Sequence, residues 1–272
     1  MEPDEPSGYE NEPREYFQPL PPELYARFYH IERHSQDLKD ELDYYQSLLG
    51  PHSPVLELGC GTGVIATALL NRGIDVFGLD LCRHMLVHHA RSPHDRLVQM
   101  DMRRLGFHQV FQAAYIAHNS LNLLVTEDAI CSCLNELKRA LLPGGRLLLH
   151  LYCAPASEIE QQRQCSLQFH IFDNSGGGKI IKETIRSRSP EARCLALEER
   201  YKIRHFSNKT KDANYCHTLR LASFTREQWL EIVSVAGFAL DTVQSNFHKS
   251  QNLGGTAASS DSSRLLVSAL SI

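Results

Sequence analysis

A loop with three glycines constrains this chain more than any other feature. Residues 59–63 read Gly-Cys-Gly-Thr-Gly and lie between an apolar run at 54–58 and a helix-like run that ends at Gly73. Glycine has no Cβ, so it adopts left-handed backbone angles and lets a ligand touch the main chain. At the carboxyl end of a strand and before a helix, such a turn is typical of a site for a nucleotide-like ligand.

The loop matches neither of the common phosphate-binding patterns. The dinucleotide pattern G-x-G-x-x-G, counted from Gly59, requires glycine at position 64, where the chain has Val64, and no Lys-Ser/Thr pair follows as in a phosphate loop. In addition, Glu57 at the end of the first strand would repel a pyrophosphate and suits a cation or an amine. The loop therefore predicts a ligand without phosphates.

Two further acidic residues end the next two apolar runs. Asp80 follows Gly61 by nineteen positions and is placed to accept hydrogen bonds from ribose hydroxyls. Asp101 ends the third run and could accept a hydrogen bond from the exocyclic amine of a base. The predicted ligand has a ribose, an adenine-like base and a positively charged arm.

Strand and helix signals alternate around this loop. Expected strands at 54–59, 75–81, 96–102, 112–124 and 146–153 alternate with expected helices at 62–73, 82–92 and 126–145. Repeated units of this kind predict a parallel sheet with helices on both faces. One broken helix or two are expected over 22–50, and a helix at 225–238 precedes a closing pair of strands at 239–247 and 264–272.

A different pattern occupies residues 156–218. The segments 167–174, 179–188, 194–205 and 215–224 alternate in polarity and are joined by turn signals, so they predict an inserted antiparallel sheet. We expect this insertion to cover the substrate or to form a dimer surface. The core is then 22–155 and 219–272, and the proline-rich, acidic segment 1–21 is expected to be flexible.

Composition excludes few classes of function but favours some. The 28 basic and 32 acidic residues give a net charge of −4, which argues against nucleic acid as a partner. Eight cysteines are scattered without a CxxC pair, and no apolar stretch approaches the roughly 20 residues that span a bilayer. We therefore expect reduced thiols, a cytoplasmic location and no membrane partner.

The motifs, taken in order, resemble those of the class I S-adenosylmethionine-dependent methyltransferases. The matching stretches are ELGCGTG, GLDLCRHML with Asp80, MDMRRL and LKRALLPGGRLLLHLY. The resemblance implies an α/β, Rossmann-like, seven-stranded and mostly parallel sheet with an antiparallel final strand, and S-adenosyl-L-methionine as cofactor. Residues 37–49 and 118–124 further resemble a subgroup that acts on small molecules and includes sugar N-methyltransferases and glycine-methyltransferase-like enzymes.

The family also implies roles for individual residues. The backbone of Gly59 and Gly61 would contact the methionine portion with Glu57 nearby, Asp80 would bind the ribose, and Asp101 with Met102 would surround the adenine. The other predicted cofactor contacts are Cys60, Gly63, Leu81, Met85 and His118.

The methyl acceptor is predicted less sharply. Asn119 lies at the carboxyl edge of the fourth strand, where open α/β sheets bind ligands, and Tyr152 lies at the end of the fifth. Tyr25, Tyr29 and His34 could form a lid that excludes water. No catalytic base is identified.

No metal site is predicted. His84 and His88 have the spacing of a zinc-binding helix, but Met85 stands where that motif carries glutamate.

The leading hypothesis is a methyltransferase that acts on nitrogen or oxygen of a small molecule. The alternatives are a non-catalytic methyltransferase-like subunit that binds a partner, a methyltransferase with a protein or RNA acceptor, and an aminopropyltransferase on the same fold.

Overall fold

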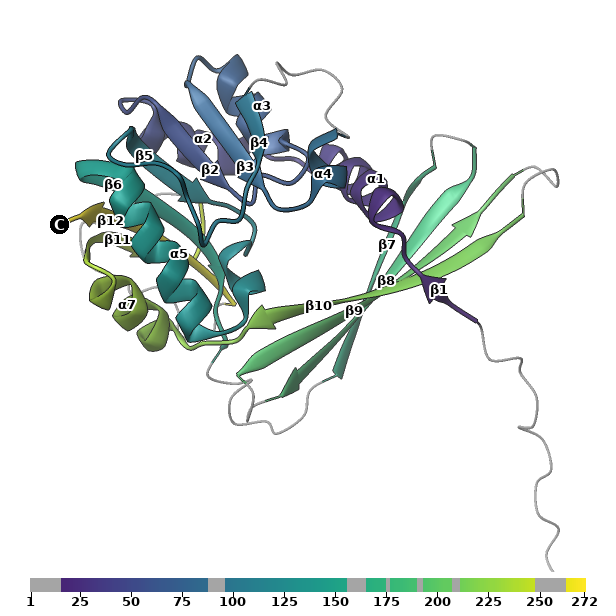
Figure 1. Ribbon diagram of the computed structural model, residues 1–272. Helices are drawn as coiled ribbons and strands as arrows, with labels where there is room; N and C mark the ends of the chain where they lie inside the picture. Colours follow the sequence, from purple (N-terminus) through teal and green to yellow (C-terminus); the bar gives the residue numbers. More distant parts are fainter. Residues whose placement is uncertain are drawn as a thin grey trace, which may run out of the picture.

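Two β-sheets dominate the computed structural model of the protein (Figure 1). The structure describes residues 16–87, 96–155, 165–174, 177–189, 193–206, 211–247 and 263–272. The helices are α1 (Pro22–His34), α2 (Lys39–Leu49), α3 (Val64–Asn71), α4 (Arg83–Val87), α5 (Glu127–Ala140), α7 (Arg226–Val235) and the 3-10 helix η2 (Leu121–Leu124). The segment over 22–50 thus forms two helices.

The larger sheet has seven strands. They are β2 (Val55–Leu58), β3 (Val76–Asp80), β4 (Leu97–Gln99), β5 (Phe111–Ile116), β6 (Leu141–Tyr152), β11 (Phe238–Gln244) and β12 (Arg264–Ser271). Their order is β11-β12-β6-β5-β2-β3-β4, and β12 runs opposite to the other six strands. This arrangement confirms the predicted sheet with its antiparallel final strand. It also brings the carboxyl ends of β2, β3 and β5 to one edge.

Helices cover both faces of this sheet. On one face, α2 and α3 pack through residues such as Leu49 and Leu69. On the other, α5 and α7 pack through residues such as Leu134 and Trp229, both fully buried. Helix α5 begins after Thr126, whose side chain accepts a hydrogen bond from the Ala129 N–H at 3.3 Å, as expected for an N-cap.

The smaller sheet is the insertion. Its strands are β1 (Gln18–Pro19), β7 (Cys165–Asp173), β8 (Lys179–Ser189), β9 (Cys194–Arg204) and β10 (Ala213–Ala222), in the order β1-β10-β9-β8-β7. Strands β7 to β10 are antiparallel, whereas β1 pairs with β10 in parallel. The boundary predicted at residue 218 falls inside β10, because the strand's pairing with β9 continues to Ala222.

Some of the predicted segments lie outside the described residues. Of the segment expected to be flexible, residues 1–15 are outside, and Gln18 and Pro19 pair with β10. Of the helix expected at 82–92, only Arg83–Val87 is described, so His88 is also outside.

Helix α1 links the two sheets. Phe28 stacks on Tyr201 of β9 with ring centroids 5.1 Å apart. Lys182 of β8 pairs with Glu32 of α1 at 2.9 Å and with Glu199 of β9 at 2.8 Å. Since both the ring pair and the ion pairs are buried or nearly so, α1 is held firmly above the edge of the larger sheet.

No helix among the described residues is both long and apolar enough to cross a membrane.

Candidate active site

The glycine loop lies between β2 and α3 and requires glycine at each of its three positions. The φ angles of Gly59, Gly61 and Gly63 are 68°, 56° and 71°. A Cβ on Gly59 would lie 2.7 Å from the Cβ of Ser120, and one on Gly61 would lie 3.2 Å from a ring carbon of Tyr29. Larger residues would therefore be strained and crowded here, and the main chain is left open to close approach.

Asp80, at the end of β3, holds the loop in place. Its Oδ2 accepts a hydrogen bond from the Gly61 N–H at 2.8 Å, and its Oδ1 accepts one from the Cys82 N–H at 2.8 Å. Burial raises the pKa of Asp80, and the two backbone donors oppose this. A carboxylate accepts about four hydrogen bonds, so each oxygen retains capacity for a hydroxyl group.

A cavity of about 310 Å³ opens beside Asp80. Predicted residues in its wall are Gly59, Asp80, Leu81, Asp101 and Met102, and the further lining residues are Met100, Arg103, Ser120, Leu123 and Leu124. The aliphatic and thioether side chains among them suit a flat, apolar group such as a purine base.

Asp101 is paired within this cavity. Its carboxylate accepts hydrogen bonds from the Arg103 guanidinium at 2.6 to 3.2 Å. Arg103 lowers the pKa of Asp101, so the group is ionised near neutral pH. An amine that bonds to Asp101 would share the carboxylate with Arg103.

Three predicted residues lie around the loop in different environments. Cys60 is buried, and its N–H donates to the Leu79 carbonyl at 2.9 Å, so its backbone rather than its thiol shapes the loop. Burial raises the pKa of the Cys60 thiol well above its ordinary value. Met85 of α4 is buried, whereas Leu81 is 62% exposed at the cavity mouth.

Glu57 is buried on the α2 side of the sheet. It is 2% exposed, and its Oε2 has no hydrogen-bond partner among the described residues. Burial raises the pKa of Glu57 to about 8, while the Tyr115 hydroxyl partly opposes the rise and the negative charge of Glu41 adds to it. A positive charge bound nearby would favour its ionised form.

Helix α1 covers the loop through its aromatic residues. Tyr29 lies against Gly61, and burial raises the pKa of Tyr29 to about 12. Tyr25 lies beside Tyr29 and 4.6 Å from the ring of His217 in β10. His30, which sequence reasoning missed, places its Nδ1 3.2 Å from the Thr62 hydroxyl.

His34 lies at the outer edge of this group, with its ring centroid 4.0 Å from that of His30. Its side chain is exposed at the end of α1, with Nδ1 2.9 Å from the carbonyl oxygen of His30.

A second cavity, of about 260 Å³, lies between the edge of the larger sheet and the insertion. The predicted residues Asn119 and Tyr152 line it together with His150 of β6. Residues from β7 to β10 and β12 complete its wall, namely Gln168, Thr184, Arg186, Leu195, Leu197, Leu221 and Arg264. The insertion therefore forms one side of a cavity that lies beside the glycine-loop edge.

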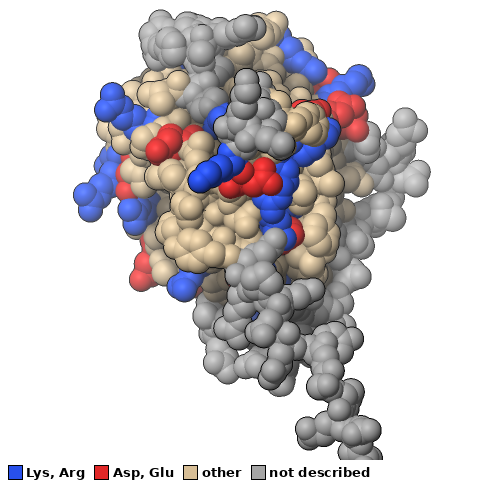
Figure 2. Space-filling model, turned by 90° about the vertical axis from the view of Figure 1, so that its right-hand side faces the viewer, with Lys and Arg blue, Asp and Glu red and all other residues tan. Residues whose placement is uncertain are grey.

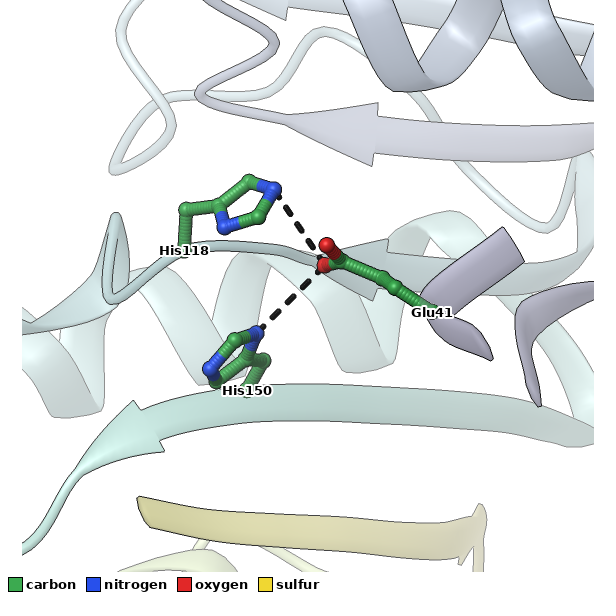
Figure 3. A group of neighbouring side chains, drawn as sticks. All are labelled: Glu41, His118 and His150. Atoms are coloured by element: carbon green, nitrogen blue, oxygen red, sulfur yellow. Dashed lines mark ion pairs between the residues drawn. The ribbon is translucent and has the colours of Figure 1, made fainter. Parts of the chain in front are cut away.

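Glu41, His118 and His150 converge next to this cavity (Figure 3). Glu41 Oε1 lies 3.2 Å from His118 Nε2 and 3.5 Å from His150 Nδ1. Arg33 of α1 contacts His118 Nε2 and lies 3.7 Å from Glu41 Oε2. Burial, followed by the charge of Arg33, lowers the pKa of His118 well below its ordinary value, so this imidazole is neutral.

Sequence reasoning did not select Glu41, His150 or Arg33. His150 was detectable, since it is the one imidazole in the otherwise apolar run LLLHLYC that follows Arg146. His118 was predicted as a cofactor contact, and here its ring faces Arg33 and Glu41. The ligand atoms of the three residues lie within 4.8 Å of one another, a spacing that would suit a metal ion.

The fold and the glycine-loop site resemble those of the class I S-adenosylmethionine-dependent methyltransferases. The sheet order, the glycine loop after β2 and the carboxylate that ends β3 are those of this class. Residues 55–145 match the family model described as a methyltransferase domain.

Two relatives with more than 30% identity match only part of this chain. The Bacillus subtilis protein YqeM is 34% identical over 103 residues, which are 36% of this chain and 42% of YqeM. The cypemycin N-terminal methyltransferase of a Streptomyces species is 32% identical over 110 residues, 39% of this chain and 44% of that protein. The matches thus span less than half the length of these relatives.

The fold as a whole is found in solved structures. The sugar N-methyltransferase KedS8 from Streptoalloteichus superposes with a TM-score of 0.70 at 16% identity, covering 100% of this chain and 98% of that one. This likeness includes the insertion, and at such low identity it concerns the fold.

Proposed function

We propose that the protein transfers a methyl group from S-adenosylmethionine to a nitrogen or oxygen atom of a small molecule. The observation that carries the proposal is the hydrogen bond from the Gly61 N–H to the Asp80 carboxylate, at the edge of a cavity with apolar walls. It places an open main chain, a carboxylate with spare acceptor capacity and a slot for a base side by side.

The residues present fit the cofactor. Gly59 and Gly61 leave room where a side chain would collide, and the oxygens of Asp80 remain able to accept ribose hydroxyls. The apolar wall with Asp101 and Met102 would receive the adenine. When bound, the cofactor supplies a methyl group on a sulfonium, an electrophile that needs alignment and a dry site more than acid or base catalysis.

The chain's own residues would provide that environment. Tyr29 over Gly61 and the burial of α1 against β8 and β9 exclude water from the loop. Asn119 follows β5 with φ 62°, and its N–H donates to the His150 carbonyl at 3.0 Å, which fixes the edge between the two cavities. The acceptor would lie in the second cavity.

Two arginines favour an acceptor that carries an anionic group. Arg186 of β8 and Arg264 of β12 line the second cavity from different elements. Arg186 also packs over the ring of Tyr152 at 5.7 Å, which places its guanidinium at the cavity wall. KedS8 is a sugar N-methyltransferase and the cypemycin enzyme methylates an N-terminus, and both names favour nitrogen over oxygen as the acceptor atom.

A nucleic-acid acceptor is less well supported. On the described part of the face in Figure 2, basic and acidic side chains are mixed and leave an uncharged area between them. A nucleic-acid site would need a basic groove or stripe. Each cysteine whose side chain is described is a free thiol, which supports a cytoplasmic location.

The edge strand β7 favours a homodimer. Leu167, Phe169 and Ile171 alternate along it and are 52%, 57% and 66% exposed. In an antiparallel pair of two β7 strands centred on Phe169, Leu167 would face Ile171 of the second copy, so the stripe is self-complementary. Light scattering should report a dimer for the wild type and a monomer for Phe169→Glu. The control Leu240→Glu, on the other edge strand β11, should remain a dimer. A monomeric wild type would refute the proposed β7 dimer.

Calorimetric titration with S-adenosylmethionine and S-adenosylhomocysteine tests the function itself. We expect binding below millimolar for both ligands. Asp80→Asn should weaken binding at least about tenfold through loss of charged hydrogen bonds, and Asp43→Asn, an exposed site on α2, should not. Absence of binding by the wild type would favour a non-catalytic subunit, and an unchanged Kd for Asp80→Asn would refute the ribose role.

A further inference from the structure

Two buried polar atoms beside the second cavity, one of them on a residue of its wall, face each other without a close hydrogen-bond partner among the described residues. They are Glu41 Oε1 and His150 Nδ1, 3.5 Å apart. The side chains of these residues are 6% and 10% exposed, so water does not readily reach them. A buried carboxylate oxygen without a donor is costly, and native structures seldom leave one.

The protons around Glu41 can be assigned from its neighbours. An arginine only donates hydrogen bonds, so the Arg33 N–H must donate to His118 Nε2. That nitrogen is then unprotonated and cannot donate to Glu41 Oε1, although it lies only 3.2 Å away. The donors left for the Glu41 carboxylate are the Tyr45 hydroxyl, which hydrogen-bonds to Glu41, and a proton on His150 Nδ1, which lies 3.5 Å from Oε1.

Arg33 also argues against a metal ion at this cluster. The lone pair of His118 Nε2 already accepts from a guanidinium, and a metal would have to displace it. Arg33 further compensates the charge of Glu41, with 3.7 Å between Nη2 and Oε2.

A proton on Nδ1 leaves the other ring nitrogen of His150 as a base. In Figure 3 this nitrogen points away from Glu41. His150 lines the second cavity, where the acceptor would lie, next to Asn119 and Tyr152. A carboxylate that fixes the tautomer of a histidine is the arrangement by which many enzymes orient a general base.

We propose that Glu41 and His150 form a proton-accepting pair for the methyl acceptor, with His150 Nε2 as the base and Glu41 as the positioning residue. The acceptor class is an amine or alcohol that still carries its proton at neutral pH. The proton leaves the ammonium or hydroxyl for Nε2, and the electron pair of the broken N–H or O–H bond stays on the acceptor as the nucleophilic lone pair. Glu41 balances the charge of the imidazolium that forms. This inference rests on the proposed function.

Nuclear magnetic resonance of the ¹⁵N-labelled full chain tests the pair directly. The ring nitrogens of His150, assigned by their loss in His150→Gln, should show Nδ1 protonated and Nε2 unprotonated in the neutral ring. In Glu41→Gln the two nitrogen shifts should move toward each other as the tautomers mix. Asp40→Asn, the exposed neighbouring carboxylate on α2, should leave them unchanged. A neutral His150 with its proton on Nε2 overturns the proposal.

The role in proton transfer has its own readout. With O-phosphoethanolamine and a panel of amino sugars as acceptors, His150→Gln should lower kcat at least about 100-fold at pH 7 with little change in KM. The loss should shrink at pH 9.5, where more of the acceptor is already deprotonated. An unchanged rate, or an equal loss at both pH values, overturns the role of His150 as base.

Two controls separate this proposal from its neighbours. If titration with Zn²⁺ shows micromolar binding that His118→Ala and His150→Ala abolish, the cluster is a metal site and the pair is refuted. If the wild type binds S-adenosylhomocysteine but neutral His150 carries its proton on Nε2, the Glu41–His150 pair is refuted and the proposed function is not. If the wild type binds no cofactor, the proposed function fails, and the catalytic role proposed for the pair fails with it.

Discussion

Replacement of Glu57 by glutamine should remove a pH dependence from the stability of the protein. The carboxyl group is 2% exposed, and burial raises its pKa from the ordinary 4.5 to about 8. Between these values the folded protein holds a proton that the unfolded chain has released. Stability contributed by this group is therefore complete below pH 4.5 and is lost as the pH rises toward 8.

The size of the effect follows from the linkage relation. One pKa unit corresponds to about 1.4 kcal/mol, so the free energy of unfolding should fall by about 1.4 kcal/mol for each pH unit inside the window. From pH 5.5 to 7.5 the wild type should lose about 2.5 kcal/mol relative to Glu57→Gln, because glutamine is of similar size and does not titrate.

Urea unfolding of both proteins without cofactor measures this difference. The fluorescence of Trp229, the single tryptophan and fully buried, reports unfolding of the core. Asp43→Asn is the matched control, since Arg72 lowers the pKa of Asp43 and its titration ends below the window. Parallel stability curves for the wild type and Glu57→Gln would refute the assignment of a buried, protonated Glu57.

Three further outcomes are expected. At pH 7, S-adenosylhomocysteine binding can be measured by calorimetry in two buffers of different ionisation enthalpy. The wild type should release a proton on binding, and Glu57→Gln should release none. Equal proton release by both proteins would show that the proton does not come from Glu57. Gly59→Ala should weaken S-adenosylhomocysteine binding at least about tenfold, because the new Cβ would lie 2.7 Å from the Cβ of Ser120. Adding Ser120→Gly to this variant should restore part of the affinity. Full affinity of Gly59→Ala would contradict the close approach of the two residues. Asn122→Ala should lower the unfolding free energy by roughly 3 to 5 kcal/mol in urea unfolding. The buried Asn122 amide donates to the carbonyls of Tyr152 and Ala222 and accepts from the Tyr152 N–H. A loss below about 1 kcal/mol would show that these backbone groups find other partners.

The sequence by itself determined the features that depend on local chemistry. The glycine loop was predictable because positive φ at Gly59, Gly61 and Gly63 has few alternatives in L-residues. Asp80 was predictable because one strand-to-helix unit has a nearly constant length, which sets the distance to the next strand end. The antiparallel order of β7 to β10 followed from their alternating polarity and short turns.

Only the tertiary structure decided how distant segments meet. The residues of the buried cluster come from four different elements, and no local pattern relates them. They are Arg33 in α1, Glu41 in α2, His118 in the turn that follows β5, and His150 in β6. The position of α1 between the two sheets likewise depends on Phe28 and Glu32 finding partners in β8 and β9. Backbone preferences act over a few residues, whereas these contacts form only after the sheets have packed. The cofactor loop was therefore predictable from the sequence, and the pair of Glu41 and His150 was not.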